Sequence, residues 1–236
     1  MLKTTNETKN FFASHKRALR LFLALGLPLI IFFKLAWEVV EKEHMKIDAP
    51  VLYFIHEHAS TTLDSVAVFI SNSGYEFGTL IAVILLACYV IFKQKKYQNL
   101  AFIAIGIGGA MVANVILKLL FMRPRPELWH WIVAESGYSF PSGHAMLSAA
   151  IAAVAIYLFW GTRHRWWIAI VAILCTTLIG LSRLYLGVHY PSDIIAGWSV
   201  SVAWVTLVDI ALKYYDRNII KSYAKHTTKP KTVALK

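Results

Sequence analysis

The sequence predicts an all-α, polytopic membrane protein with six transmembrane helices and a helical outer loop between the first and the second. Three observations lead to this fold class: the composition, the apolar runs and the placement of basic residues. Of the 236 residues, 58% are hydrophobic and only 16% are charged, which is too apolar for an ordinary soluble domain. A bilayer core about 30 Å thick needs roughly 20 mostly apolar residues per helix, so runs of about that length mark the expected spans.

Six such runs are bounded by charged or loop residues. They cover Leu19–Val39, Phe77–Phe92, Leu100–Phe121, Ala145–Trp160, Trp166–Tyr185 and Ile194–Leu212. The first run is too long and too far from the start for the apolar region of a signal peptide, and no small-residue cleavage site follows it. We therefore expect it to remain as a membrane anchor.

The basic residues indicate the orientation of these spans. The net charge is +11, and 17 of the 24 Lys and Arg residues lie in the N-terminal end up to Arg20, after the last run, or in the loops after the second and fourth. The positive-inside rule then places both termini in the cytoplasm. Since topology accounts for the basic excess, we expect the bilayer as a partner and no nucleic acid.

The chain divides into a cytoplasmic segment 1–18, a six-helix membrane domain 19–214 and a basic cytoplasmic tail 215–236 that we expect to be disordered. The longest outer loop covers about 41–76. Within it, Ala49–His58 is apolar but too short to span the membrane, which is typical of an interfacial helix. Thr61, Thr62 and Asp64 then suit the first turn of another short helix. Both cysteines, Cys88 and Cys175, lie within apolar runs, which indicates neither a disulfide framework nor a cysteine metal site.

Three polar clusters lie at the outer ends of the last four runs, where ionisable residues are costly in a membrane. The first contains Lys118 and the sequence Arg123-Pro124-Arg125-Pro126. A residue before proline is excluded from the α region, so both arginines should be extended and the helix should end near Met122. Alone, this cluster is also typical of a membrane anchor.

The second cluster, Ser139-Phe140-Pro141-Ser142-Gly143-His144, opens the fourth helix. Pro141 suits the first helical position, and Ser142 and Gly143 would then present free backbone N–H groups of the kind that bind phosphate. A well-capped helix with an interfacial His144 explains this cluster equally well.

The third cluster runs from Ser182-Arg183 to Asp193 and joins the last two helices. Gly187 is expected to stop one helix and Pro191 to start the next, which leaves His189 in the turn between them. Asp193 could simply favour the helix dipole. It could also accept a hydrogen bond from one nitrogen of His189, which would leave the other nitrogen unprotonated and nucleophilic. Alternating spans bring all three clusters to one membrane face, which favours a shared site.

In order and spacing, Lys118 with Arg125-Pro126, then Pro141-Ser142-Gly143-His144, then Ser182-Arg183 with His189 and Asp193, resemble the three-part signature of the type 2 phosphatidic acid phosphatase superfamily. The resemblance implies a membrane phosphatase domain with His189 as nucleophile, Asp193 as its orienting partner and His144 as the acid for the leaving oxygen. It further implies that the phosphoryl oxygens are held by Lys118, Arg125, Arg183, Ser142 and the Gly143 N–H. It leaves Arg123 without a role beyond a supporting or headgroup contact.

The chemistry of these residues agrees with a reaction that needs no cofactor and no metal. Phosphoryl transfer asks for in-line positioning and charge stabilisation, which three cations and a helix start can supply. Asp193 is the only acid in the three motifs, whereas Mg²⁺ prefers several oxygen ligands.

The expected function is hydrolysis of a lipid phosphate at the outer face of a bacterial cytoplasmic membrane. By analogy with relatives of the family, undecaprenyl diphosphate and phosphatidylglycerophosphate are the leading substrates. Two alternatives stay open at this point: a phosphotransferase that passes the phosphoryl group to a lipid or sugar hydroxyl, and a non-enzymatic anion or lipid carrier. A carrier would use the cations but has no evident need for His189, Asp193 and His144 together.

Overall fold

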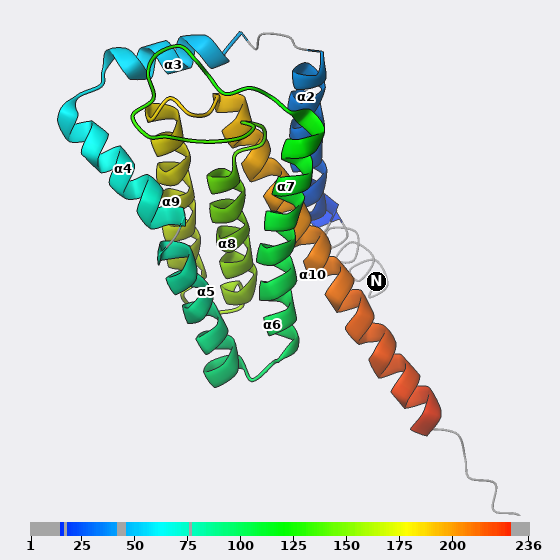
Figure 1. Ribbon diagram of the computed structural model, residues 1–236. Helices are drawn as coiled ribbons and strands as arrows, with labels where there is room; N and C mark the ends of the chain where they lie inside the picture. The colour runs from blue at the N-terminus through cyan, green and yellow to red at the C-terminus, as the bar shows by residue number, and fades with distance from the viewer. Residues whose placement is uncertain (1–14, 17, 42–45, 76, 228–236) are drawn as a thin grey trace, which may run out of the picture.

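Helices make up all the regular secondary structure of the described residues, which are 15–16, 18–41, 46–75 and 77–227 of a computed structural model (Figure 1). The elements in chain order are η1 (Phe22–Gly26), α2 (Leu27–Val40), α3 (Asp48–Glu57), α4 (Thr61–Tyr75), α5 (Phe77–Tyr89), η2 (Val90–Gln94), α6 (Gln98–Ile103), η3 (Ala104–Gly108), α7 (Gly109–Phe121), α8 (Gly143–Phe159), α9 (Arg165–Tyr185) and α10 (Pro191–Thr227).

The helices have the length and composition that a bilayer requires, which confirms the all-α membrane class. Five stretches within the described residues are long and apolar enough to cross a membrane: Ala18–Val40, Thr61–Gln94, Gln98–Phe121, Arg165–Tyr185 and Pro191–Asp216. The apolar helix α8 is shorter, with 17 residues. All six runs expected from the sequence lie on these helices, apart from single residues at their ends.

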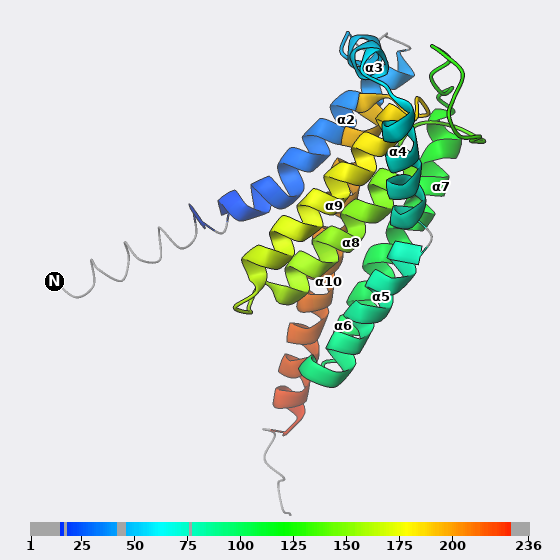
Figure 2. The ribbon, with the colours of Figure 1, turned by 90° about the vertical axis from the view of Figure 1, so that its left-hand side faces the viewer.

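Helix α8 lies at the centre of the bundle and contacts α7, α9 and α10 (Figure 2). Its alanine-rich sequence favours helix formation and lets neighbouring helices approach closely. Ala150 and Val154 are fully buried, and they pack in one cluster with Val90 of η2 and Val205 of α10. The helix that carries the second polar cluster is therefore the most enclosed of the bundle.

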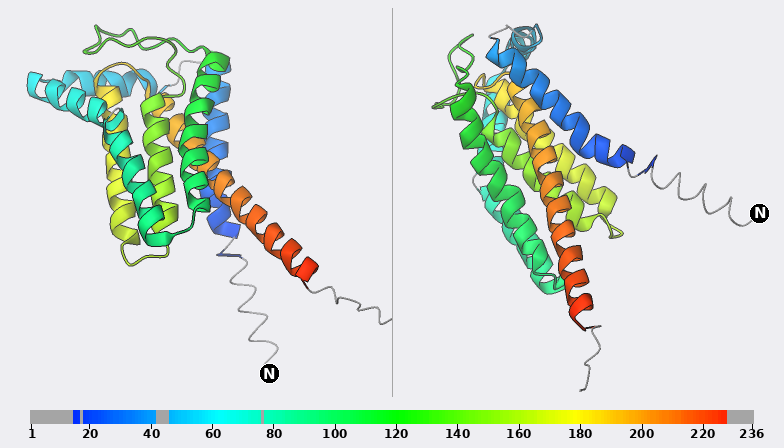
Figure 3. Two further views of the ribbon diagram at one scale, coloured as in Figure 1. Left: turned by 60° about the horizontal axis from the view of Figure 1, so that its bottom comes forward. Right: turned by 90° about the vertical axis from the view of Figure 1, so that its right-hand side faces the viewer.

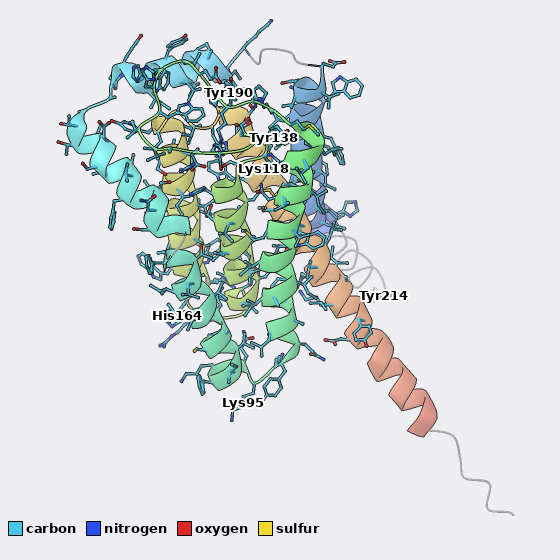
Figure 4. All side chains as sticks on the ribbon, in the orientation of Figure 1. Lys95, Lys118, Tyr138, His164, Tyr190 and Tyr214 are labelled. Carbon is cyan, nitrogen blue, oxygen red and sulfur yellow. The ribbon has the colours of Figure 1, made fainter. Side chains whose placement is uncertain are left out.

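Helix α3 lies across one end of the bundle rather than along it, and Figure 2 shows it nearly end-on (Figures 1 and 2). The long loop 122–142 and the turn between α9 and α10 reach the same end (Figure 3). In Figure 4, Lys118, Tyr138 and Tyr190 are grouped at this end, whereas Lys95 and His164 lie at the opposite one. The three polar clusters thus share one end, and two of the basic loops lie at the other.

Three wide π-helical turns interrupt the spans, and side chains of α10 lie within hydrogen-bond distance of backbone carbonyls in two of them. In η1, the carbonyl oxygen of Ala24 lies 3.0 Å from the Thr206 hydroxyl, which also accepts a hydrogen bond from Tyr157 at 3.0 Å. In η3, the Ile105 carbonyl accepts a hydrogen bond from the Trp204 indole at 3.1 Å. Polar side chains therefore pair inside the bundle, as a low-dielectric interior demands.

Two expectations about helix extent are corrected. The helix α4 covers 15 residues, longer than the short helix expected there, because an apolar run from Val66 to Ile70 follows its first turn. Helix α10 continues to Thr227, past the expected end of the last span and into the segment 215–236 that we expected to be disordered. No glycine or proline interrupts the sequence between Gly197 and Pro230, so helix propensity carries the backbone onward. Residues 228–236 lie outside the described residues.

Candidate active site

The three polar clusters meet around a cavity of about 490 Å³ at the α3 end of the bundle. Six residues selected from the sequence line it: Lys118, Arg125, Gly143, His144, Arg183 and His189. Ser142 and Asp193 are buried next to these residues and are not part of the lining. Long-range packing therefore assembles in one place what the sequence distributes over 76 positions, from Lys118 to Asp193.

His189 and Asp193 form a buried pair. The Nδ1 atom of His189 lies 3.3 Å from Oδ2 of Asp193, and the side chains are 2% and 0% exposed. The same Oδ2 accepts a hydrogen bond from the backbone N–H of Tyr190 at 2.9 Å. An ionised Asp193 selects the tautomer with hydrogen on Nδ1, which leaves Nε2 of His189 unprotonated toward the cavity.

Local sequence rules set the turn that carries His189, as expected. Helix α9 ends at Tyr185, Gly187 follows with a φ of 75°, and α10 begins at Pro191. A side chain at Gly187 would meet two obstacles, because a left-handed φ disfavours L-residues and because its Cβ would lie 2.7 Å from the Trp129 indole nitrogen. The glycine thus fixes the position of His189 two residues later.

The start of α8 corrects one expectation about the second cluster. The helix begins at Gly143, with Ser142 as its extended N-cap, so Pro141 does not occupy the first helical position. Tertiary contacts hold this segment extended: Asn114 donates to the Pro141 carbonyl at 3.0 Å, and the Ser142 N–H donates to the Asp193 carbonyl at 3.2 Å. The Gly143 N–H remains one of the first-turn donors of the helix.

Ser142 keeps an unused donor beside the cavity. Its side chain is fully buried, makes no capping bond, and its hydroxyl has no hydrogen-bond partner within the part of the chain that the structure describes. Gly143 lies tightly against α7, since a Cβ there would be 3.1 Å from the Asn114 amide oxygen. A small anion near these two residues would satisfy the hydroxyl, as buried polar groups require.

The cations are held around the cavity by backbone carbonyls. Lys118 donates to the carbonyl of Tyr138 at 2.5 Å. Arg125 is buried, donates to the Val188 carbonyl at 2.8 Å, and its Nη1 lies 3.2 Å from Nε2 of His189. Helix α7 ends at Phe121, and Met122 follows with a φ of 45°, so the expected stop before the two Arg-Pro units is confirmed.

Glu135 of the loop 122–142 bridges two of these cations, and the sequence reasoning missed it. One carboxylate oxygen accepts a hydrogen bond from Arg183 and the other lies 3.3 Å from Arg125, while Arg183 also donates to Ser71 of α4 at 2.6 Å. Burial opposes ionisation of Glu135, but the charge and hydrogen bond of Arg183 and the charge of Arg125 outweigh it, so the pKa of Glu135 is lowered. The carboxylate lies where an anionic group can contact both arginines.

Three further residues near the site lie outside the sequence motifs. Asn72 of α4 and Asn114 of α7 line the cavity, and Ser71 is buried against Arg183. Asn114 stands four residues before Lys118, so helical periodicity alone places it on the same face. Nothing in the local sequence relates Ser71 or Asn72 to the motifs, because α4 reaches the site only through packing.

Burial also tunes His189. Desolvation lowers the pKa of His189 to about 4 and outweighs the hydrogen bond and the negative charge of Asp193, which act in the opposite direction. A histidine with this pKa is neutral at pH 7, so Nε2 retains its lone pair. The site therefore combines a neutral, oriented imidazole with three surrounding cations and a helix start.

We expect the protonation of His189 to follow this shift. Because its pKa lies near 4 rather than near the ordinary value of 6.5, the imidazole stays neutral as the pH falls from 7 to 5 and gains its proton only near pH 4. An NMR titration of histidine-labelled protein, with the His189 signal identified by its loss in His189→Asn, measures the midpoint. A midpoint between 6 and 7 would contradict the prediction.

Comparisons with known proteins show the family to which this chain belongs. The profile of the PAP2 superfamily matches residues 99–217. The chain is 30% identical over 151 residues to phosphatidylglycerophosphatase B of Bacillus subtilis, covering 62% of this chain and 73% of that protein. It is 27% identical over 199 residues to the undecaprenyl-diphosphatase of Sulfolobus acidocaldarius, covering 82% and 90%.

A solved structure is similar over most of its length. The crystal structure of a transmembrane PAP2 type phosphatidylglycerolphosphate phosphatase from Bacillus subtilis matches with a TM-score of 0.68 and 26% sequence identity, covering 81% of this chain and 96% of that one. The matched family region begins at residue 99, so Asp48, Ser71 and Asn72 lie outside it.

Proposed function

Because this chain belongs to the PAP2 superfamily, we propose that it is a membrane lipid phosphatase that hydrolyses its substrate through a phosphohistidine on His189. The observation that carries the proposal is the buried His189–Asp193 pair, with Nε2 directed to a cavity lined by Lys118, Arg125 and Arg183. A neutral imidazole with one nitrogen engaged by a carboxylate is an activated nucleophile.

In the first step, Nε2 of His189 attacks phosphorus in line with the leaving oxygen. The P–N bond forms, the P–O bond to the leaving group breaks, and His144, in its protonated form, donates a proton to the departing oxygen, which belongs to the lipid hydroxyl of a monophosphate or to the lipid phosphate of a diphosphate. Asp193 stabilises the positive charge that develops on the His189 ring. The surrounding cations stabilise the negative charge on the phosphoryl oxygens as the nitrogen attacks.

In the second step, His144 takes a proton from water as the water oxygen attacks phosphorus. The P–N bond breaks, inorganic phosphate leaves and His189 returns to its neutral form. Lys118, Arg125, Arg183, the Ser142 hydroxyl and the Gly143 N–H hold the phosphoryl oxygens in both steps. The proposal assigns charge stabilisation to these groups and uses no metal ion, so turnover is expected to persist in EDTA.

For the membrane arrangement, we propose six spans, with α8 as the sixth beside the five long apolar helices. The basic loops that contain Lys95 and His164 lie at the end opposite the site (Figure 4). With the positive-inside rule, this charge distribution supports cytoplasmic termini and a site at the outer face of a bacterial cytoplasmic membrane. Labelling of single cysteines introduced at Lys95 and Glu127 in intact cells tests the orientation.

For the substrate, we propose a phosphate or diphosphate on an apolar tail, with undecaprenyl diphosphate or phosphatidylglycerophosphate first. The names of the relatives support both. A second hollow of about 560 Å³ shares Asn72 with the cavity; Val68, Phe69 and Ile132 line it together with the polar Asp64, Ser65 and Ser73, and its apolar side chains offer a contact for a tail. Phosphate release by purified protein from a panel of lipid phosphates identifies the preferred headgroup.

The hydrolase differs from the two alternatives in a simple assay. Release of free phosphate without any lipid or sugar acceptor supports hydrolysis, whereas dependence on an acceptor supports a phosphotransferase. Lipid transport that survives loss of His189 would support a carrier. Inhibition by vanadate, which resembles the transition state of phosphoryl transfer, is expected only of an enzyme.

We expect Glu135→Gln to tighten substrate binding. The substituted amide removes a negative charge that competes with the phosphate for Arg125 and Arg183, so KM should fall about tenfold, which corresponds to about 1.4 kcal/mol. The interaction of two charges 4 Å apart in a partly buried site is about 4 kcal/mol, so the predicted change in binding free energy is smaller than one full charge–charge interaction. Steady-state kinetics on a lipid phosphate measure it, with Glu127→Gln, an exposed carboxylate of the same loop, as control. A raised KM in Glu135→Gln would refute the prediction.

A further inference from the structure

We propose that Arg123 and Asp48 are positioning residues that hold Asp193 in place for its contact with His189, an inference that rests on the function proposed above. Arg123 lies two residues before Arg125, and both precede a proline. Only Arg125 lines the cavity. The guanidinium of Arg123 instead binds Asp193, through the carboxylate oxygen that does not face His189.

The contacts of Arg123 fix one oxygen of Asp193 and leave the other to His189. Its Nη1 donates to Oδ1 of Asp193 at 2.6 Å, while Oδ2 of the same carboxylate faces the ring of His189. The Cζ atom of Arg123 also lies 4.1 Å from the centre of the Tyr190 ring, which restrains the plane of the guanidinium. The carboxylate therefore cannot rotate without losing a charged hydrogen bond.

Asp48 holds Arg123 from the other side. Its Oδ2 lies 2.7 Å from Nη2 of Arg123, and the two side chains are 6% and 13% exposed. Asp48 also accepts hydrogen bonds from the backbone N–H and the hydroxyl of Ser192, at 3.0 and 2.6 Å. One acid from the N-terminal end of α3 thus fixes both the arginine and the residue just before Asp193.

One arginine lies between two acids in this group. Burial opposes the charge on Arg123, but the negative charge of Asp193 and the hydrogen bond with Asp48 outweigh it, so the pKa of Arg123 is raised. The positive charge of Arg123 and the hydrogen bond from the Tyr190 N–H let Asp193 stay ionised although it is 0% exposed. Without Arg123, the carboxylate would lose the contact that fixes its orientation toward His189.

These contacts also separate Arg123 from the phosphate-binding arginines. Arg125 and Arg183 face the cavity, whereas Arg123, Asp48 and Asp193 are not among its lining residues. A positioning residue acts on the rate of the chemical step, and a phosphate-binding residue also acts on the affinity for the phosphoryl group. The two arginines of Arg123-Pro124-Arg125-Pro126 are therefore expected to differ in their kinetic effects.

The test compares Arg123→Gln and Asp48→Asn with the unchanged protein in detergent, using a lipid phosphate as substrate and inorganic phosphate as a probe of anion affinity. We expect kcat to fall about 10- to 100-fold in either variant, since a misplacement of about 1 Å can cost about that much. KM and the inhibition constant of inorganic phosphate should change less than threefold. The double variant should lose less than the product of the single losses, because both act through one contact.

The pH dependence provides a readout that a merely structural role would not move. The groups that face His189 are Asp193, Arg125, Arg183, Lys118, Glu135 and His144. Arg123 and Asp48 lie outside this group of facing residues. Arg123→Gln removes a positive charge and should raise the midpoint of the His189 NMR titration, whereas Asp48→Asn removes a negative charge and should lower it. Midpoints that shift in opposite directions from that of the unchanged protein support the proposal, and midpoints that do not shift in either variant overturn it.

Two further variants keep the test decisive. Arg123→Lys retains the charge but loses the forked geometry, so it should recover only part of kcat; it also serves if Arg123→Gln does not fold. Lys213→Gln breaks another ion pair of α10, with Asp209 at 2.7 Å, and should leave kcat unchanged. Normal kcat in Arg123→Gln, together with an inactive His189→Asn, would overturn this inference alone, whereas an active His189→Asn would overturn the proposed function itself.

Discussion

Replacement of His189 by asparagine is expected to abolish phosphate release, lowering kcat by about 10⁴-fold or more, as loss of a covalent nucleophile does in other enzymes. An asparagine amide can still reach Asp193 and fill much of the space of the ring, so the buried turn should persist. It cannot attack phosphorus at the position of Nε2. Phosphate release from a lipid phosphate by the purified variant measures the loss.

Two observations connect this loss to chemistry rather than to folding. The variant should elute as the same species in size-exclusion chromatography and should retain binding of inorganic phosphate, because the cations that line the cavity are unchanged. His130→Asn, at an exposed histidine of the loop 122–142, should have normal activity. Substantial turnover in His189→Asn would rule out the phosphohistidine mechanism.

We expect His144→Asn to lower kcat about 10²- to 10⁴-fold on a lipid phosphate, the usual range for loss of a general acid or base. The loss in kcat should depend on the leaving group. A lipid alkoxide needs a proton to depart, whereas p-nitrophenolate leaves without one. The rate of the first step should therefore fall much less with p-nitrophenyl phosphate. Water activation is impaired with either substrate.

A burst experiment separates these two roles of His144. With p-nitrophenyl phosphate, the variant should release about one nitrophenolate per active site quickly and then turn over slowly, while an acid-labile phosphohistidine accumulates. With the lipid phosphate there should be no burst, because the first step is itself slow. Equal losses on both substrates, without a trapped phosphoenzyme, would contradict the assignment of His144 as acid and base.

Local sequence rules were sufficient for the spans and for most helix ends. A helix satisfies its own backbone hydrogen bonds, so an apolar run of adequate length must be helical wherever it meets lipid. The helix end before the two Arg-Pro units, Gly187 after α9 and Pro191 at the start of α10 all follow local sequence rules, although Met122 itself has a left-handed φ that these rules favour for glycine. The prediction for Pro141 was wrong, because Asn114 binds the Pro141 carbonyl and the Asp193 carbonyl binds the N–H of the extended Ser142 before α8 begins.

The sequence by itself therefore determined the fold class, the expected spans and the motif residues that come to line one cavity. Only the tertiary structure decided what surrounds them: Glu135 between two arginines, Ser71 against Arg183, and Asp48 beneath Arg123. Arg123 and Arg125 have the same local sequence, so no local rule separates them. Their different partners depend on where α3 and α10 pack, which brings Asp48 to Ser192 across 144 positions of the chain. Such contacts arise from the packing of whole helices, which short-range propensities do not encode.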